Sequence, residues 1–346
     1  MRLSRLLLAA FSAISLQAGR MPAQAPDRLP DTCYLFSSFR GNGEDGLHLA
    51  WSVDGFKWEA LNGDRSFLQP VVGKERLMRD PCIAQGPDGV YRMVWTDSWN
   101  DRTIGYASSR DLIHWSGQRA VPVMEHEPAA RNCWAPEVDW DAKRGRFLIF
   151  WSTTIPGRFP ATEKTEQGGY NHRIYATTTT DFETFAPTRL FFDPGMNCID
   201  ATILPRDGNF LLFFKDETRF PKPMKNLRMA TAGDIEGPYA VDPKPLNPPD
   251  SWTEGPTSIR IGGDTIVYFD CYRQHCYGAV RTRDLGTWED VSSLLAMPKG
   301  MRHGTVFTVP RAVLQRLLSE PVAASEPNSE ASARVAPAAA PNLPAH

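Results

Sequence analysis

Short apolar stretches alternate with turn residues along most of the chain. Residues 91–95, 147–151, 210–214 and 265–269 are apolar runs, and each follows a turn that contains Gly together with Asp, Asn, Arg or Lys. Asp-Gly and Gly-Gly between such runs are hairpin signals. No window keeps a 3.6-residue apolar period over its length, so the pattern predicts strands. The one helix it predicts is short, near residues 311–318.

A short sequence motif recurs along the chain at roughly regular intervals. A small or hydroxyl residue precedes an Asp, and an aromatic residue follows about four positions later. Clear copies contain Asp54, Asp111, Asp181 and Asp284, and a degenerate copy contains Asp234, at intervals of 50 to 70 residues. A repeat of about 50 residues with four antiparallel strands is typical of a propeller blade, whereas a β-sandwich needs no such period. Five copies predict an all-β, five-bladed β-propeller. We expect the Asp residues of the four clear copies to cap turns far from its axis.

The two ends of the repeat are incomplete in complementary ways. The first copy, residues 33–61, lacks an inner strand, and residues 304–309 form a lone strand. We expect these segments to complete one blade together and so to close the ring. The propeller is therefore predicted to cover residues 26–318.

The residues outside this range have a different composition. Arg2 and Arg5 precede an apolar run at residues 6–16, which is too short to span a bilayer. We therefore expect a cleaved signal at residues 1–25, export to the periplasm or the medium, and no membrane insertion. Residues 319–346 are mostly Ala, Pro, Ser and Glu, which have little to bury, so we expect a disordered tail.

The net charge and the cysteine content limit the partners and the disulfides that we expect. The net charge of −2 gives no electrostatic reason to expect a nucleic-acid partner, and we expect a monomer. The 6 cysteines allow 15 full pairings in an oxidising compartment, and the sequence does not choose among them. Cys271 and Cys276 flank a predicted hairpin turn and are the best local pair. The other four are expected to be buried thiols.

An ionisable residue stands near the start of the first strand of each blade. The five are Asp80, Glu137, Asp200, Glu254 and His303. We interpret them as one topological position repeated five times, and we expect them to converge at one mouth of the axis. Glycoside hydrolysis uses such a gathering, because one carboxylic acid must stay protonated for the leaving oxygen while a carboxylate acts on water or the sugar.

The neighbours of these residues resemble a known family. Asp80-Pro81, Trp134-Ala135-Pro136, Ile199-Asp200, Glu254-Gly255-Pro256 and Arg302-His303-Gly304 are similar to motifs of glycoside hydrolase family 43, the arabinanase, arabinofuranosidase and xylosidase family, over about residues 33–310. The resemblance implies a five-bladed propeller that hydrolyses with inversion. It implies that Asp80 is the general base, Glu254 the general acid, and Asp200 the acid that adjusts the pKa of Glu254. Ala201 departs from the family, which often has Pro there.

The resemblance also implies a place for His303 beneath the substrate, near a calcium ion or a water cluster. No cofactor is otherwise required, and the sequence names no set of oxygen ligands for calcium. Glu137 is expected either to bind sugar hydroxyls or to pair with Arg131 or Arg158. Trp134 is expected either to stack on a sugar or to fill the core. The remaining predicted substrate-binding residues are Asn132, Trp99, Trp252 and Arg302, and His172 and His275 are taken as ordinary loop residues.

The expected substrate is an oligo- or polysaccharide. The long insertion between Trp151 and His172 is expected to wall the pocket, which favours exo-action on a terminal arabinofuranoside, galactofuranoside or xyloside. One alternative is a retaining fructan- or sucrose-type propeller, which shares Arg79-Asp80-Pro81 but needs an Asn-Asp-Pro and a Glu-Cys that this sequence lacks. The other is a non-catalytic carbohydrate-binding propeller. Inversion predicts that the Asp80 and Glu254 carboxyls lie roughly 6.5–9.5 Å apart.

Overall fold

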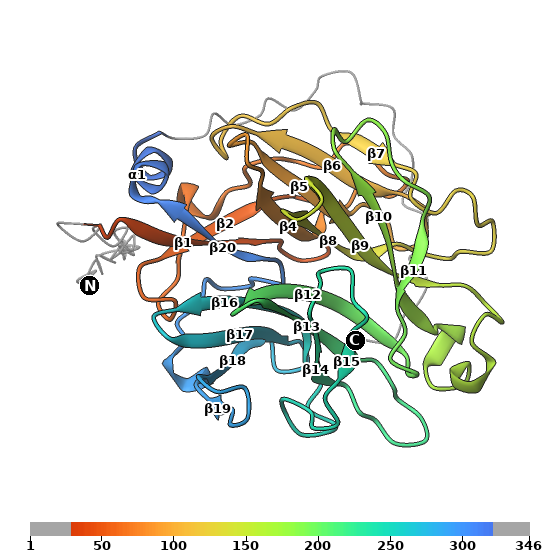
Figure 1. Ribbon diagram of the computed structural model, residues 1–346. Helices are drawn as coiled ribbons and strands as arrows, with labels where there is room; N and C mark the ends of the chain where they lie inside the picture. Colours follow the sequence, from red (N-terminus) through yellow and green to blue (C-terminus); the bar gives the residue numbers. More distant parts are fainter. Residues whose placement is uncertain (1–28, 321–346) are drawn as a thin grey trace, which may run out of the picture.

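The chain folds into five sheets around a common axis. The computed structural model describes residues 29–320. Within them, five four-stranded antiparallel sheets surround the axis (Figure 1), which confirms the predicted all-β propeller of five blades. The predicted signal, residues 1–25, lies outside the described residues, as does the predicted tail beyond Glu320.

The strands of each sheet follow one another from the axis to the outer edge. The first sheet contains β4 (Arg79–Gln85), β5 (Tyr91–Thr96), β6 (Ile104–Ser109) and β7 (Arg119–Val121). The second contains β8 (Trp134–Asp141), β9 (Arg146–Thr154), β10 (His172–Thr179) and β11 (Arg189–Phe192). The third contains β12 (Cys198–Arg206), β13 (Asn209–Asp216), β14 (Asn226–Ala232) and β15 (Ala240–Val241). The fourth contains β16 (Glu254–Ile261), β17 (Asp264–Cys271), β18 (Cys276–Thr282) and β19 (Glu289–Asp290).

The fifth sheet joins the two ends of the folded chain, as predicted. It contains β20 (Val306–Pro310), β1 (Thr32–Ser38), β2 (His48–Ser52) and β3 (Glu59–Ala60). β20 pairs with β1, with Val306 opposite Phe36. The predicted helix follows as α1 (Arg311–Ser319), and it buries Leu314 and Leu317 in the apolar cluster that also contains Cys33 and Leu35 of β1. Four short 3-10 turns complete the described elements: η1 (Asn62–Asp64), η2 (Pro160–Thr162), η3 (Gln167–Gly169) and η4 (Ser292–Leu294).

The recurring Asp residues have the structural role that the repeat predicts. Asp54, Asp111, Asp181 and Asp284 each accept two backbone N–H bonds, from the residues two and three positions later, at 2.7 to 2.9 Å. Such local bonds let a short side chain fix a turn. Each of these turns leads to the outer edge of its blade.

The apolar core is divided among the contacts between neighbouring blades. At one such contact Tyr106 of the first blade stacks on Phe182 of the second, with ring centroids 4.5 Å apart. Cys33, Cys82, Cys133 and Cys198 are buried thiols, as expected. Cys271 and Cys276 face each other across the β17–β18 hairpin, but both thiols are free, so the favoured disulfide is not formed.

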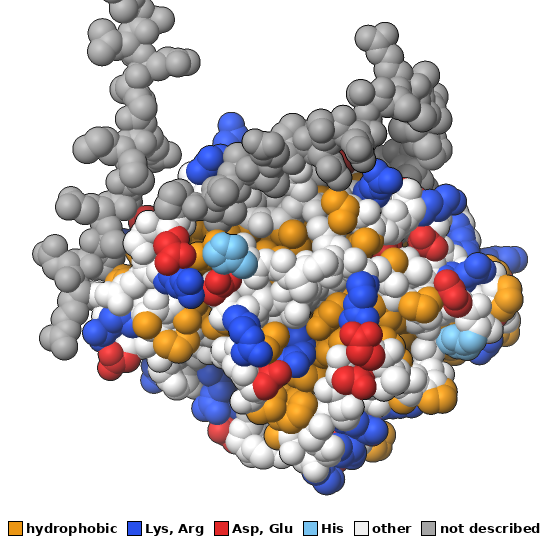
Figure 2. Space-filling view, turned by 90° about the horizontal axis from the view of Figure 1, so that it is seen from above, with side chains coloured by type: hydrophobic (Ala, Val, Ile, Leu, Met, Phe, Trp, Pro, Cys, Tyr) orange, Lys and Arg blue, Asp and Glu red, His pale blue; other side chains and the backbone are white. Residues whose placement is uncertain are grey.

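The outer surface carries mixed charge. Figure 2 shows a face on which basic, acidic and apolar side chains are interspersed. None of the helices within residues 29–320 has the length and apolarity that crossing a membrane requires.

Candidate active site

The innermost strands of the first four blades share a β-bulge near their start. In β4, Arg79 pairs with Thr96 and Cys82 with Val94, so two residues of β4 face a single residue of β5. The same shift occurs in β8, β12 and β16. The residues on the bulge have positive φ: Asp80 (53°), Ala135 (46°), Asp200 (53°) and Gly255 (55°). Positive φ is uncommon outside Gly, and bulges often re-aim side chains beside active sites.

The bulge corrects the predicted alignment of the five ionisable residues. Asp80 and Asp200 stand on the bulge, Glu254 stands one residue before it, and Glu137 stands two residues after it. The prediction that these residues share one topological position was therefore wrong, because they stand at different places relative to the bulge of their strands. An inserted residue moves neighbouring side chains to different depths along the axis, and counting to the next apolar run does not reveal it.

Aligned on the bulge, the axial residues form successive rings. The residues just before the bulge are Arg79, Trp134, Ile199 and Glu254. The fifth blade adds Arg302, which forms a bridge with Phe39. We call these five residues the entrance ring, and all of them line one cavity of about 250 Å³. The next residues form the bulge ring, whose polar members line the same cavity: Asp80, Asp200 and His303. The predicted catalytic acids therefore converge, at two depths.

Besides the predicted Trp99, the cavity is lined by residues that the sequence analysis did not single out. Thr96 and Glu217 lie at or just after the ends of the second strands β5 and β13, and Asn42 lies in the loop after β1. Antiparallel pairing brings the end of each second strand to the start of the first, where the acids stand. The sequence signal that could have identified residues at this end of the second strands is a polar residue directly after an apolar run, such as Lys215 after residues 210–214.

Asp80 is held by two groups at the bulge ring. His303 Nε2 lies 2.5 Å from Asp80 Oδ1, and the Thr96 hydroxyl donates to Asp80 Oδ2 at 2.7 Å. Burial favours the neutral carboxyl, but the charge and hydrogen bond of His303 outweigh it, so the pKa of Asp80 is lowered. Burial opposes protonation of His303, yet Asp80 and Glu254 raise its pKa to about 9. At neutral pH the two residues are an imidazolium–carboxylate pair.

Asp200 lies between these groups and the next blade. Its Oδ2 accepts the Gly255 N–H at 2.9 Å, which ties it to the residue after Glu254. Burial raises the pKa of Asp200 to about 6; the charges of Glu254 and Asp80 add to this, and those of His303 and Lys215 oppose it. Asp200 is therefore the predicted catalytic acid that takes up a proton most readily.

Glu254 is held by two cations at the entrance ring. Arg302 Nη2 lies 3.0 Å from Glu254 Oε1, and Lys215 Nζ lies 3.0 Å from Oε2. Arg302 also binds Asp270 at 2.6 Å through Nε. Burial alone would raise the pKa of Glu254, but Lys215, His303 and Arg302 together hold it well below its ordinary value.

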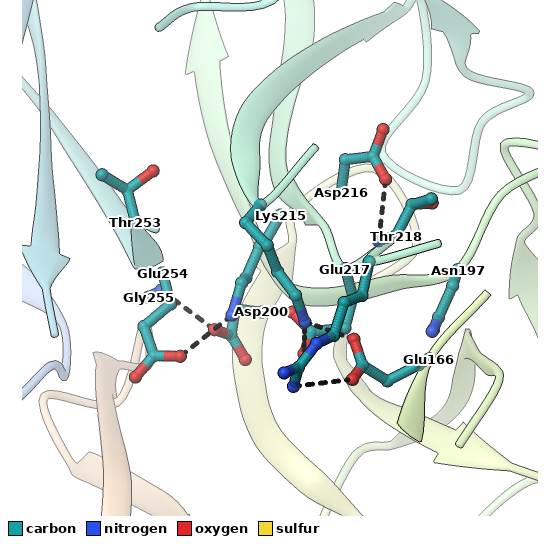
Figure 3. A network of polar contacts seen from close by, with 12 residues as sticks. Glu166, Asn197, Asp200, Lys215, Asp216, Glu217, Thr218, Thr253, Glu254 and Gly255 are labelled. Carbon is teal, nitrogen blue, oxygen red and sulfur yellow. Dashed lines mark hydrogen bonds and ion pairs between the residues drawn. The ribbon is translucent and has the colours of Figure 1, made fainter. Parts of the chain in front are cut away.

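Lys215 connects Glu254 to a longer chain of buried charges (Figure 3). Its Nζ lies 2.7 Å from Glu217, and Lys225 Nζ lies 2.6 Å from the other oxygen of Glu217 and also contacts Glu166. Signs alternate along the chain, so each charge has a partner of opposite sign. A buried charge left without such a partner is strongly destabilising, and each link therefore depends on the next.

Two predicted tryptophans line the cavity. The rings of Trp99 and Trp134 meet edge to face at 5.5 Å, and Trp134 Nε1 donates to the Trp99 carbonyl. On its other side Trp134 packs against Tyr170 and His172. His172 is buried at the start of β10, so its interpretation as a loop residue was wrong. Trp134 thus both faces the cavity and fills the space behind it.

Two other predicted binding residues lie away from the cavity. Asn132 is buried, and its amide bonds the backbone of β9 at Ser152 and Thr154. Trp252 lies beside Arg273, whose guanidinium is 3.1 Å from its ring centroid. Neither is among the residues that line the cavity.

Glu137 lies deeper on the axis. It accepts hydrogen bonds from Thr202 at 2.8 Å and Thr305 at 3.4 Å, and burial raises its pKa well above its ordinary value. Arg131 and Arg158 bond elsewhere, to Gly168 and Glu127, so the rim ion pair, one of the two alternatives for Glu137, was wrong.

The insertion between β9 and β10 supports the cavity from behind. Tyr170 packs on Trp134, and Glu166 contacts Lys225. Residues 155–171 do not line the 250 Å³ cavity themselves. The expected wall is therefore a second layer, which acts on the cavity through Trp134 and the buried charges.

The surroundings of His303 do not fit calcium. Glu254, Asp270 and His303 place one ligand atom each within 4.8 Å of one another. Calcium takes six to eight oxygen ligands. Here the guanidinium of Arg302 already binds both carboxylates, and Lys215 adds a second positive charge. These cations already neutralise the carboxylates that a calcium ion would need.

Comparisons with known proteins relate the chain to glycosyl hydrolases. A family model described as "Probable glycosyl hydrolase domain", related to glycoside hydrolase family 43, matches residues 30–314. The chain is 25% identical over 217 residues to an α-L-arabinofuranosidase of Bifidobacterium longum subsp. longum, and the match covers 54% of this chain. It covers 20% of that protein, so the chain spans about a fifth of the length of this curated relative.

Two solved structures are also similar. An α-L-arabinofuranosidase from Lactobacillus brevis aligns with a TM-score of 0.49 and 17% identity, covering 62% of this chain and 72% of that one. An arabinanase from Bacillus subtilis aligns with a TM-score of 0.46 and 15% identity, covering 63% and 78%. The family model spans nearly the whole propeller, and the chain therefore belongs to this family of glycosyl hydrolase domains related to glycoside hydrolase family 43.

Proposed function

We propose that the protein is an inverting, exo-acting glycoside hydrolase. The observation that carries this proposal is the convergence of three carboxyls, Asp80, Asp200 and Glu254, from three different blades on one cavity of about 250 Å³. That volume is below the roughly 300–1,000 Å³ of pockets for drug-sized ligands, which favours a single terminal sugar. The substrate is an oligo- or polysaccharide, and the protein is exported and monomeric.

In this mechanism Asp80 is the general base. Its lowered pKa keeps it ionised, ready to accept a proton from the water that attacks the anomeric carbon. The His303 imidazole lies between the two reacting carboxyls, with Nε2 2.5 Å from Asp80 and Nδ1 3.7 Å from Glu254. This arrangement supports the wider carboxyl separation that leaves room for water in inverting hydrolysis.

Glu254 donates the proton to the leaving oxygen, and Asp200 adjusts its proton affinity. Because Lys215 and Arg302 hold Glu254 ionised in the free protein, the proton enters the pair through Asp200, whose pKa is about 6. The Asp200–Glu254 pair holds a proton below about pH 6 and loses it as pH rises above 6. We therefore expect kcat/KM to fall as pH rises through about 6.

The sugar is a terminal furanoside, an α-L-arabinofuranoside or β-D-galactofuranoside, or else a xyloside. The arabinofuranosidase of Bifidobacterium longum supports the first of these. Trp99 and Trp134 provide apolar ring faces at the cavity, which suit the C–H face of a sugar.

The test is hydrolysis of nitrophenyl furanosides and pyranosides by the purified protein, with the product anomer followed by NMR. We expect release of a terminal sugar with inverted configuration. Asp80→Asn should abolish most activity on these substrates, and Glu254→Gln should do so on an alkyl glycoside, whose leaving group needs a proton. The control variant, Asp207→Asn, changes an acid that pairs with Arg260 on the outer surface, and it should retain full activity.

Other results would contradict the proposal in different ways. A retained anomer would favour the fructan- or sucrose-type alternative. Sugar binding without turnover, unchanged in Asp80→Asn and Glu254→Gln, would favour the carbohydrate-binding alternative.

A further inference from the structure

Arg79 differs from the other cations at the cavity. Arg302, Lys215 and His303 each lie within 3.0 Å of a carboxylate oxygen. Arg79 lines the same cavity and is 7% exposed, yet it has no carboxylate within 4.0 Å among residues 29–320. It occupies the same entrance-ring position in the first blade that Glu254 occupies in the fourth.

The side chain of Arg79 is fixed in place by its surroundings. The guanidinium lies 4.7 Å from the Phe39 ring centroid and 4.2 Å from that of Trp99. Nη1 donates to Asn42 Oδ1 at 3.1 Å, and Trp99 Nε1 donates to the same oxygen at 3.0 Å. Gly43 closes over the side chain, where a Cβ would lie 3.0 Å from Arg79 Cγ. Arginine stacked on aromatic rings in this way is already oriented for a ligand.

Two donors of this fixed guanidinium remain available. Nε and Nη2 of Arg79 form no hydrogen bond with any residue that the structure describes. Four carboxylates line the cavity. Asp80 is bound by His303, Glu254 by Arg302 and Lys215, and Glu217 by Lys215 and Lys225. The fourth, Asp200, accepts the Gly255 N–H and lies more than 4.0 Å from the guanidinium nitrogens of Arg79. A buried cation is most stable beside a carboxylate, and a ligand that carries one would supply the partner that Arg79 lacks in the protein.

We propose that Arg79 binds a carboxylate on the terminal sugar, so that the substrates include uronides. A carboxylate can accept two parallel N–H bonds from the guanidinium, whereas a neutral hydroxyl makes weaker, single contacts. This inference rests on the proposed function only in taking the ligand to be a sugar. It places the carboxylate beside Trp99 and Asn42, at the entrance-ring end of the cavity.

Matched sugars isolate the carboxylate. Glucuronic acid and xylose have the same ring configuration and differ at C5, where xylose lacks the carboxylate. Calorimetry with sodium glucuronate, xylose and glucose measures binding without requiring turnover. The variants are Arg79→Gln and Arg79→Lys, and the control is Arg283→Gln, which alters an exposed arginine on the outer surface. Thermal unfolding checks that each variant is folded.

We expect glucuronate to bind at least tenfold more tightly than xylose or glucose. In Arg79→Gln its affinity should fall about 10- to 100-fold, the range for a hydrogen bond to a charged group. Neutral sugars should change less than about threefold. Arg79→Lys should keep part of the preference, and Arg283→Gln should keep all of it.

The same pair of sugars as nitrophenyl glycosides gives the kinetic counterpart. Hydrolysis of the glucuronide should exceed that of the xyloside, and only the glucuronide should lose kcat/KM strongly in Arg79→Gln. Equal binding of glucuronate and the neutral sugars, a uniform loss in Arg79→Gln, or no glucuronate binding at millimolar concentration would overturn the proposal. Selective binding of glucuronate without hydrolysis of any glycoside would instead contradict the proposed function and leave the role of Arg79 supported.

Discussion

Asp80 and Glu254 face the same cavity from different blades, and their surroundings differ in kind. Asp80 stands on the bulge beside one imidazole and one hydroxyl, those of His303 and Thr96. Glu254 stands one residue earlier, between Arg302 and Lys215, at the end of a chain of buried charges. One carboxylate therefore depends on a partner that loses its charge as pH rises through about 9. The other depends on partners that stay charged.

The largest effect expected from this difference separates the two acids by leaving group. Asp80→Asn and Glu254→Gln should each lower kcat/KM by roughly 100- to 10,000-fold for an alkyl glycoside, the usual contribution of a general base or acid. With a nitrophenyl leaving group, which needs little protonation, the Glu254→Gln defect should shrink while the Asp80→Asn defect persists. Steady-state kinetics on the two substrate types measure this. Equal sensitivity of both variants to the leaving group would remove the distinction.

The second prediction removes one cation beside Glu254. Lys215→Met should lower the free energy of unfolding, by less than the roughly 3–5 kcal/mol of a wholly unpaired buried charge, because Glu254 keeps Arg302 and Glu217 keeps Lys225. It should also raise the pKa of Glu254, so the alkaline limb of the pH–kcat/KM profile should move to higher pH. The matched control is Lys225→Met, which breaks the chain at Glu217 and Glu166 without touching Glu254. A limb that moves equally in both variants would contradict a specific role for Lys215.

The third prediction concerns the partner of Asp80. The pKa of His303 is raised from 6.5 to about 9 in the folded protein. A raised pKa contributes stability that is fully present below pH 6.5 and is lost as pH rises through 9. The expected loss is about 3 kcal/mol in the free energy of unfolding. Urea unfolding at several pH values measures it, and His303→Gln should flatten the dependence; an unchanged slope in that variant would assign it to another group.

The smallest expected effect tests the second partner of Asp80. Thr96→Val removes the hydroxyl that donates to Asp80 and accepts the Ala135 N–H. The stability loss should be about 1–3 kcal/mol, and the pKa of Asp80 should rise, so the acidic limb of the activity profile should move to higher pH. Thr96→Ser, which keeps the hydroxyl, is the control and should leave the limb in place.

The difference between the two acids also marks where prediction from sequence succeeds. The turn motif around Asp54, Asp111, Asp181 and Asp284 identifies the blades because a turn is a local structure, fixed by residues two and three positions apart. The convergence of Asp80, Asp200 and Glu254 follows from blade order alone. Both features were predictable without knowing how strands pair.

The depth of each acid was not predictable in the same way, because it depends on strand register. Pro81, Pro136 and Pro256 directly follow the bulge residue, and proline inside an inner strand was a usable sign of a bulge. The partners of Glu254 leave weaker traces. Lys215 and Glu217 are two polar residues after an apolar run, and only pairing between blades shows that they turn inward.

The closure of the ring by β20 and β1 has a consequence for how the site comes into being. Arg302 and His303 lie three to four residues before β20, which is the last strand in sequence among residues 29–320 and pairs with β1. Until that pairing forms, Asp80 lacks the imidazolium that neutralises it, and Glu254 has Lys215 but not the guanidinium of Arg302. An open ring would gather acids whose charges repel, so the closing strand brings the counter-ions at the same moment as the last backbone contacts. Assembly of the catalytic charges and completion of the fold are then a single event, and a chain shortened before residue 302 would lose both together.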